Sequence, residues 1–456
     1  MALQIIILAA GQGTRMRSDK PKVLHKIGGK PLLAHVYELS QKFDNCKITV
    51  VYGFGGEKVL SELSDLKVTW IEQTERLGTG HAVMQATPAL DDEDTVLVLY
   101  GDVPLLAHTT ADRLLKSVDQ NNLSLLTVDL IDPSGYGRII RNQDNQVQMI
   151  VEEKDTTDQQ KKIKEGNTGI LATNAGNLKR WLSRLNNNNA QGEFYLTDII
   201  AMAVSEGIPI KTSQPETVDE VLGINNKIQL AHLERTYQIR NAYKLMELGV
   251  TFADPHRFDL RGSILEVGQD VEFDVNVVLE GDIRIGNRVK IGPNTTIRDV
   301  EISDDVEILP NCLIEGAHIG KRCRLGPFAR IRPEVKLSDD VRIGNFVEIK
   351  KSELGNRSKI NHLSYIGDSE VGADVNIGAG AITCNYDGAN KFKTIIEDGA
   401  FIGSDTQLVA PVTVSKNSTV GAGSTITKDT PADTLTLSRS NQISIKGWQR
   451  PIKKRN

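Results

Sequence analysis

The chain has 456 residues and a formal net charge of −5, with 39% hydrophobic and 25% charged residues. This length allows two or three domains with their own cores, while the acidic balance argues against a nucleic-acid binder. No apolar run reaches the length of a membrane span. Four widely spaced cysteines show neither zinc spacing nor a disulfide framework. We therefore expect a cytoplasmic protein with reduced thiols and without a signal peptide.

The first half of the chain alternates short apolar runs with helical patterns. Strands are expected at 5–8, 48–51 and 95–100, and helices at 32–41 and from 80 to 86. Strands that alternate with helices predict an α/β domain with a mostly parallel sheet. Such sheets bind ligands beyond the carboxyl ends of their strands, so the residues that follow each strand are the candidates for a site.

A loop of small residues follows the first strand. The run from Leu8 to Met16 reads LAAGQGTRM, and its glycines allow a backbone to approach a phosphate while Arg15 supplies positive potential. It is not a Walker A loop, and Met16 replaces the third glycine of the dinucleotide fingerprint. A plain strand-to-helix turn is the alternative. Lys22 could place a point charge on a phosphate, or it could be a solvated surface lysine.

The strand at 95–100 is followed by Gly101 and Asp102. A carboxylate at this edge is well placed to hold Mg²⁺ carried by a nucleotide, although a turn or helix-cap role is the alternative. Other polar or glycine-containing loops add candidate contacts in this domain, namely Gln73, Gly78, Thr79, Gly135, Tyr136, Gly137, Asn167, Thr168, Gly169 and 223–226.

The second half of the chain follows a different period. Residues 226–249 carry a helical stripe, which predicts one long linking helix. From Val267 to Ile426 an aliphatic residue recurs at almost every sixth position. This period predicts a β-solenoid of hexapeptide units whose aliphatics point into the stack. The pattern breaks at 384–392, where we expect a loop to leave the column, and loops on rigid scaffolds often carry function.

Some polar residues of the solenoid exceed what its corners need. They recur at intervals close to one coil, so they could stack along one wall. His362 is suited to removing a proton near neutral pH, and a hydrogen-bonding corner is its alternative role. Cations around it suggest a site for an anionic ligand. The set comprises Arg330, Arg332, Glu348, Lys350, Lys351, His362, Tyr365, Asn376 and the loop from Cys384 to Lys391.

Together these motifs resemble the bacterial family of bifunctional N-acetylglucosamine-1-phosphate uridyltransferases and glucosamine-1-phosphate N-acetyltransferases, across essentially the full length. The run from Leu8 to Met16 with Pro21 and Lys22 is similar to the nucleotidyltransferase signature for sugar phosphates. Residues 361–365 and 385–391 resemble the acetyltransferase site. None of the matching positions departs from the family pattern, except that Gln12 stands where a lysine is often found.

The resemblance implies an α/β fold with three parts. These are a Rossmann-like uridyltransferase domain at 1–227, a linker helix at 228–248, and a left-handed parallel β-helix of hexapeptide repeats with a C-terminal tail at 249–456. It also implies a cytoplasmic homotrimer with acetyltransferase sites between subunits. The partners would be small-molecule substrates, without nucleic acid or membrane insertion.

The implied N-terminal reaction joins N-acetylglucosamine-1-phosphate to UTP, giving UDP-N-acetylglucosamine and pyrophosphate. By similarity, Asp102 and Asn225 bind Mg²⁺, while Arg15 and Lys22 stabilise charge on the phosphates. The sugar phosphate is itself the nucleophile, so positioning and charge stabilisation would carry the catalysis. By similarity, Leu8, Ala9, Ala10, Gly11, Gln73, Gly78 and Thr79 hold the uridine, and Tyr100, Gly101, Gly137, Glu152 and Asn167 complete the nucleotide-sugar site.

The implied C-terminal reaction moves an acetyl group from acetyl-CoA to the amine of glucosamine-1-phosphate. The attacking amine must be uncharged, so a base is needed, and by similarity it is His362. The pathway would supply precursors of peptidoglycan and lipopolysaccharide. By similarity, Arg332, Lys350, Tyr365, Asn376 and Lys391 hold the amino-sugar phosphate, and Ala379, Asn385, Tyr386, Ser404, Ala422 and Arg439 lie at the acetyl-CoA.

Two other hypotheses stay open. A single-activity nucleotidyltransferase could use its solenoid only to assemble an oligomer, but it gives no reason for His362, Tyr365 and Lys391 to occur together. A non-catalytic regulatory subunit would be expected to lose Asp102 or Lys22, and both are present.

Overall fold

The computed structural model of the protein describes residues 2–453. The chain divides into two compact units, Met1–Tyr237 and Gln238–Asn456. Helix α7 (Lys227–Glu247) begins in the first unit and ends in the second. No helix among residues 2–453 combines the length and the apolar character that crossing a lipid bilayer requires.

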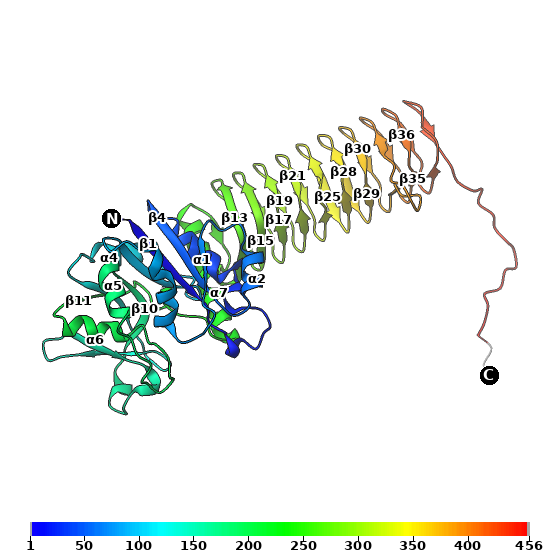
Figure 1. Ribbon diagram of the computed structural model, residues 1–456. Coiled ribbons are helices and arrows are strands. Elements are labelled where there is room, and N and C mark those ends of the chain that lie inside the picture. The colour runs from blue at the N-terminus through cyan, green and yellow to red at the C-terminus, as the bar shows by residue number, and fades with distance from the viewer. Residues whose placement is uncertain (1, 454–456) are drawn as a thin grey trace. The chain divides into compact units, whose positions relative to one another are not determined.

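The first unit is built on a nine-stranded sheet (Figure 1). Its strand order is β11-β7-β10-β6-β1-β4-β5, with β8 paired to β10 and β9. The strands are β1 (Leu3–Ala9), β4 (Cys46–Tyr52), β5 (Thr69–Glu72), β6 (Thr95–Tyr100), β7 (Leu123–Asp129), β8 (Arg138–Arg141), β9 (Val147–Val151), β10 (Glu165–Asn174) and β11 (Ile210–Ser213).

Strand β1 is the point where the strand order reverses. It pairs in parallel with β4 on one side and with β6 on the other. The chain therefore builds outward through β4 and β5 and then crosses back to β6, which opens a crevice at the carboxyl ends of β1 and β6. The expected mostly parallel sheet is confirmed, although β10 runs antiparallel to both β6 and β7.

Alternate side chains of β1 belong to two separate hydrophobic cores, one on each face of the sheet. Ile5 and Ile7 pack on one face of the sheet, and Ile6 and Leu8 pack on the other. Helices α1 (Leu32–Ser40), α2 (Gly56–Glu62) and α4 (His108–Lys116) cover the first face, while α3 (Thr79–Ala86), α5 (Ala175–Leu182) and α6 (Asp198–Ser205) cover the second. A sheet buried on both faces explains why its central strands are continuous apolar runs.

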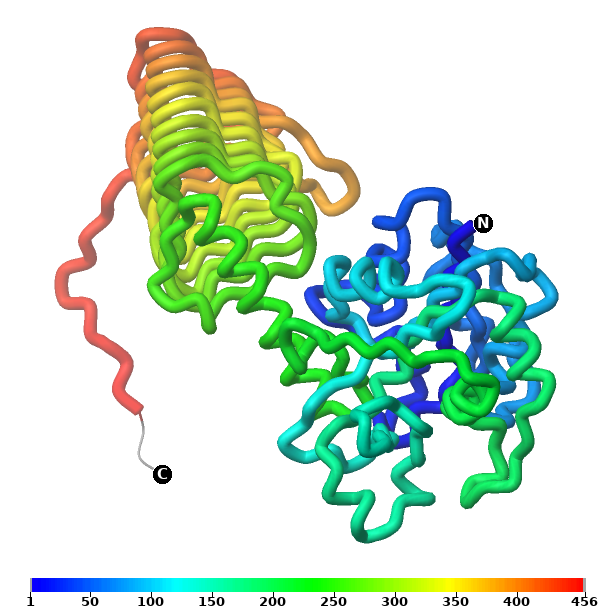
Figure 2. Tube along the Cα trace, turned by 90° about the vertical axis from the view of Figure 1, so that its left-hand side faces the viewer, coloured from blue at the N-terminus to red at the C-terminus, as the bar shows by residue number. Residues whose placement is uncertain are grey.

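The second unit is a column of short parallel strands stacked coil upon coil (Figure 2). One ladder runs from β12 (Thr251–Phe252) to β39 (Leu435–Thr436), and a second, which covers the other faces, runs from β13 (Phe258–Val267) to β38 (Thr425–Ile426). The parallel β-solenoid predicted from the period of six is therefore confirmed.

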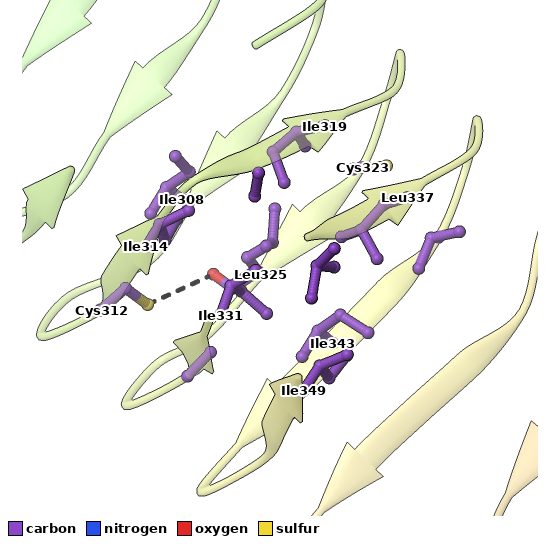
Figure 3. Packing of buried hydrophobic residues seen from close by; sticks show 14 of the residues in the cluster. Ile308, Cys312, Ile314, Ile319, Cys323, Leu325, Ile331, Leu337, Ile343 and Ile349 are labelled. Carbon is purple, nitrogen blue, oxygen red and sulfur yellow. Dashed lines mark hydrogen bonds between the residues drawn. The ribbon is translucent and has the colours of Figure 1, made fainter. Parts of the chain in front are cut away.

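The aliphatic residues of the six-residue pattern form the core of the column. Ile331, Ile343 and Ile349 are at most 1% exposed. Figure 3 shows these side chains pointing inward from consecutive coils. Each coil therefore covers the apolar face of the next, so the column is stable only as a stack.

One loop leaves the column where the sequence pattern breaks. After β32 (Ile382–Cys384) the chain turns outward, and Tyr386 pairs with Lys391 across the loop in an antiparallel bridge. The chain rejoins the stack at β33 (Thr394–Ile396). The loop stands out from the side of the column in Figure 2, as the sequence predicted.

Candidate active sites

A cavity of about 710 Å³ opens at the carboxyl ends of β1 and β6. Its volume suits a nucleotide-sized ligand. The residues that sequence analysis assigned to this site and that line the cavity are Leu8, Ala9, Ala10, Gly11, Lys22, Gln73, Gly78, Thr79, Tyr100 and Asp102.

A cation lies between two oxygen-bearing side chains at the edge of this cavity. Lys22, in the 3₁₀ turn η2 (Lys22–Leu24), forms an ion pair with Asp102. Its Nζ also lies 3.3 Å from Asn225 Oδ1. Gly13 lets the loop pack on this lysine, because a Cβ there would lie 2.8 Å from Lys22 Cβ and φ is +64°. The structure thus brings together three predicted residues that are far apart in sequence.

The oxygens of Asp102 and Asn225 suit a small hard cation. Both face the same ammonium group, and carboxylate and amide oxygens are ligands that Mg²⁺ accepts. Among residues 2–453 there is no group of three or more His, Cys, Asp or Glu side chains that could hold a metal. Phosphates of a nucleotide and water would have to complete the coordination of any Mg²⁺ held here, which is the usual arrangement for this ion.

The residues predicted for the sugar lie close to one another near Tyr100. A Cβ on Gly137 would lie 3.5 Å from Glu152 Oε2, and the Asn167 amide N–H donates to the Gly137 carbonyl over 2.8 Å. Burial raises the pKa of Glu152, although Thr197 Oγ1 donates to its Oε1 at 2.9 Å. Burial also raises the pKa of Tyr100, so its phenol keeps its proton. These groups can exchange hydrogen bonds with hydroxyls.

Two other predicted residues occupy different places. Arg15 is exposed on the 3₁₀ turn η1 (Thr14–Met16), does not line the cavity and makes no hydrogen bond or ion pair with residues 2–453. Gly101 acts through its backbone, because its N–H donates to the Leu8 carbonyl at 2.9 Å and so joins the ends of β1 and β6.

Several cavity residues were not predicted. Arg76 lines the cavity and lies over the Phe54 ring, 5.9 Å from its centroid. Glu193 also lines it. The only signal for Arg76 was its place between Gln73 and Gly78 in a loop that already held candidates. Glu193 carried no signal, because nothing in its own segment shows that the chain returns to this edge.

The column places a second cluster of charged residues in register. Strands β26 (Glu348–Lys350) and β29 (Tyr365–Gly367) pair so that Lys350 lies opposite Gly367. Lys350 Nζ lies 3.2 Å from Asp368 Oδ2, and the Asn385 amide donates to the same carboxylate oxygen. The adjacent Lys350 ammonium lowers the pKa of Lys391. Asp368 was not predicted from the sequence. Its carboxylate contacts both the Lys350 ammonium and the Asn385 amide.

Arg332 lies one coil away from Lys350. Its backbone N–H donates to the Ile349 carbonyl at 2.9 Å, and its guanidinium pairs with Glu348 at 2.8 Å. The cluster therefore has three cations, on Arg332, Lys350 and Lys391, and two carboxylates, on Glu348 and Asp368. The excess positive charge favours an anionic ligand.

His362 ends strand β28 (Lys359–His362) and pairs in register with Asn345 of β25 (Arg342–Asn345). Its Nδ1 lies 3.0 Å from Asn345 Oδ1. An amide oxygen only accepts, so with Asn345 in this orientation a neutral ring would carry its hydrogen on Nδ1 and keep a lone pair on Nε2. This is the tautomer that a base needs. Asn345 was not predicted, because its role depends on the stacking of two coils.

The remaining predicted residues form a row on the last coils. The Asp405 amide N–H donates to the Ala379 carbonyl at 2.7 Å, and the Gly423 amide N–H donates to the Ser404 carbonyl at 2.8 Å. A Cβ on Gly423 would lie 3.7 Å from Arg439 Cδ. Ala422 lies between Gly421 and Gly423 in this row. Small residues leave the backbone accessible along the row.

Asn376 lies on a different ladder from Lys350. It belongs to β31 (Asn376–Ile377) and pairs with Lys359 and Phe401, whereas Lys350 belongs to the second ladder. His362 lies on the same ladder as Asn376, so within one chain neither residue stacks with the cation cluster, and the expected single wall is divided between two ladders.

Comparison with known proteins identifies the family. The chain matches the MobA-like NTP transferase domain over residues 5–130 and the hexapeptide repeat of succinyl-transferase over residues 393–428. It is 60% identical over 455 residues to the bifunctional protein GlmU of Methylococcus capsulatus, covering 100% of this chain and 99% of the relative. The chain belongs to the GlmU family. The GlmU of Nitrosospira multiformis is 55% identical over 453 residues, which covers 99% of this chain and 98% of that protein.

Membership in the GlmU family makes this chain a bifunctional transferase. The cavity at β1 and β6 lies in the unit that contains the nucleotidyltransferase match, and the hexapeptide match lies in the column. The predicted fold, which combined a nucleotidyltransferase domain with a hexapeptide β-helix, is confirmed.

Proposed function

We propose that this GlmU family member makes UDP-N-acetylglucosamine in two steps, for peptidoglycan and lipopolysaccharide synthesis. The column acetylates glucosamine-1-phosphate with acetyl-CoA, and the first unit then transfers UMP from UTP to the product. The observation that carries the proposal is the presence of two separate sites with different chemistry. One holds Lys22 against Asp102 and Asn225, and the other presents a histidine Nε2 lone pair on a column with a cation cluster.

In the first unit, a phosphate oxygen of N-acetylglucosamine-1-phosphate would attack the α-phosphorus of UTP. The bond from that phosphorus to the bridging oxygen breaks, and pyrophosphate leaves. Asp102 and Asn225 would hold Mg²⁺, which neutralises phosphate charge. Lys22, beside them, would stabilise the charge that develops on the leaving group.

The other residues of this site would position the two substrates. Arg15 would approach the phosphates from its exposed turn. The uridine would be held by Leu8, Ala9, Ala10, Gly11, Gln73, Gly78 and Thr79, and the sugar by Tyr100, Gly101, Gly137, Glu152 and Asn167.

In the column, the amine of glucosamine-1-phosphate would attack the thioester carbonyl of acetyl-CoA. A C–N bond forms, the C–S bond breaks, and CoA leaves as a thiolate, which becomes the thiol when the proton lost by the amine is passed to it. His362 Nε2 would take the proton that the amine must lose. The phosphate would be held by Arg332, Lys350, Tyr365, Asn376 and Lys391, and acetyl-CoA by Ala379, Asn385, Tyr386, Ser404, Ala422 and Arg439.

One pair of matched variants in each unit tests these assignments. Lys22→Ala should lower kcat/KM for UTP about 10²- to 10³-fold, measured as pyrophosphate release. Lys30→Ala removes a surface lysine paired with Glu38 and should leave this kcat/KM unchanged.

His362→Ala should slow CoA release about 10²- to 10⁴-fold. His318→Ala, which removes a histidine paired with Glu301, should not. Wild-type rates in Lys22→Ala or His362→Ala would contradict the respective role.

The protein would act as a cytoplasmic homotrimer whose acetyltransferase site is shared between copies. Phe328, Phe346 and Leu363 occupy corners of consecutive coils at φ +57°, +57° and +49°, and are 48%, 55% and 63% exposed. Large apolar residues are uncommon in this conformation, and an exposed apolar row favours a protein contact. A neighbouring copy could also bring Asn376 to Lys350. The four cysteines are free, as in a reducing compartment.

A further inference from the structure

Gln73 presents one polar atom to the nucleotide cavity. It follows β5, is 4% exposed, and its backbone N–H donates to the Tyr52 carbonyl at 2.7 Å. Its side-chain Nε2 donates to the Gly78 carbonyl at 3.1 Å and lies 3.0 Å from His81 Nδ1. Both hydrogens of the amide are therefore used on the protein side. Oε1 makes no hydrogen bond with residues 2–453, so it is the atom that Gln73 offers to a ligand.

The Gly78 carbonyl decides which way this amide faces. A backbone carbonyl only accepts hydrogen bonds, so reversing the amide of Gln73 would place two acceptors 3.1 Å apart. His81 supplies the second acceptor when its neutral ring carries the hydrogen on Nε2. Together the two acceptors fix the amide of a buried side chain, which has no water to compensate a lost bond.

His81 is itself held in place by its surroundings. It lies in the first turns of α3, next to Gly80, whose N–H donates to the Phe194 carbonyl at 2.8 Å. The His81 and Phe194 rings have centroids 6.4 Å apart. Gln85, one turn later, places its amide 3.1 Å from His81 Nε2. The same Gln85 Nε2 donates to the His81 carbonyl at 3.2 Å, so a hydrogen on His81 Nε2 requires the Gln85 amide to turn away from that carbonyl. Gln85 is half-buried, so water can replace the bond that it loses, whereas Gln73 is 4% exposed.

We propose that His81 is a positioning residue that sets base specificity, by holding Gln73 so that only an acceptor faces the nucleobase. Uracil has an N–H at ring position 3, whereas cytosine, a ring of the same size, has a lone pair there. Gln73 Oε1 would accept a hydrogen bond from the uracil N–H, but it would face the cytosine lone pair, which repels it. A site built to pair with a polar group discriminates more strongly than a site that selects by size. Thymine shares the N–H and would not be distinguished in this way.

This proposal rests on the proposed uridyltransferase function. The test compares kcat/KM for UTP with kcat/KM for CTP in the full chain. His81→Phe keeps a ring beside Phe194 but removes the acceptor, and it should lower the UTP/CTP ratio about tenfold or more. His81→Asn can offer an amide oxygen near the position of Nδ1 and should keep most of the ratio. His108→Phe makes the same exchange outside the cavity, where His108 packs on Phe43, and should leave the ratio unchanged.

A wild-type UTP/CTP ratio in His81→Phe would overturn the inference, and so would an equal loss with both nucleotides. If His81→Phe fails to fold, the histidine tautomer of the wild-type protein decides. In ¹⁵N NMR spectra of histidine-labelled protein, the His81 signal is the one that disappears in His81→Asn. In the wild type this signal should show the hydrogen on Nε2. A hydrogen on Nδ1 would overturn the inference. If the wild type transfers no UMP from UTP, the proposed function itself is wrong, which a change in selectivity alone would not imply.

Discussion

Asp102 lines the nucleotide cavity because it follows β6, whose carboxyl end opens onto that cavity. The strand at 95–100 was predicted with the bounds that β6 has, and the carboxyl end of a parallel strand places the next residues at the ligand edge. Asn225 comes from a distant segment, 223–226, which the sequence offered only as one of several candidate loops, so its place beside Asp102 followed from the resemblance alone. Asn345 and Asp368 could not be predicted, because their contacts with His362 and Lys350 arise when coils stack.

Glu206 carries a residue-scale prediction about stability. Hydrogen bonds from Arg180 and Trp181 lower its pKa from 4.5 to about 2. The charged form is therefore favoured in the folded state, and its contribution is complete above about pH 4.5 and is lost as the pH falls through about 2. Glu206→Gln should lower Tm at pH 7, and the difference from wild type should shrink below pH 4.5. Thermal unfolding of both proteins from pH 7 to pH 3 checks this, and a constant difference would contradict it.

Elements were predictable where one period dominates the sequence. The step of six residues identified the inward positions of the column, such as Ile331 and Ile349, because a stacked coil repeats the same environment. The antiparallel course of β10 was not predictable, since its apolar run resembles that of a parallel strand. The spacing also does not determine the hand of the coil, which depends on backbone geometry between units.

Gly344 offers a test at the scale of stacked elements. It lies in β25, and a Cβ there would meet the Asn361 carbonyl oxygen of β28 at 2.0 Å. Gly344→Ala should force the two strands apart, lower the stability of the column by about 1–3 kcal/mol and displace His362 from Asn345. Acetyl transfer should fall while uridyl transfer by the same protein is unchanged. Loss of both activities together would contradict a local effect.

At the scale of the whole molecule, each unit has its own core and its own candidate site. The change from alternating strands and helices to the period of six separated these parts in the sequence. The proposed trimer could not be derived from the six-residue period, because residues at the corners of the coils can change without altering that period. The apolar corner row of Phe328, Phe346 and Leu363 became visible only when the coils were stacked.

Phe346→Asp tests the proposed assembly. A charge in this row should dissociate the trimer, which sedimentation would measure, and should reduce acetyl transfer at least tenfold because a buried unpaired charge is costly. Uridyl transfer should persist. Ile131→Asp, at a residue of the first unit that is 96% exposed, is the control and should leave the mass unchanged. A trimer that survives Phe346→Asp would show that the row is not the interface.

The most direct test of two reactions in two units is a coupled assay read by mass spectrometry. Wild type, His362→Ala and Asp102→Ala would receive glucosamine-1-phosphate, acetyl-CoA, UTP and Mg²⁺. Wild type should make UDP-N-acetylglucosamine, and Asp102→Ala should accumulate N-acetylglucosamine-1-phosphate. His362→Ala should make product only when that intermediate is added. A wild-type protein that uses added N-acetylglucosamine-1-phosphate but never acetylates would contradict this account and leave the column as a scaffold.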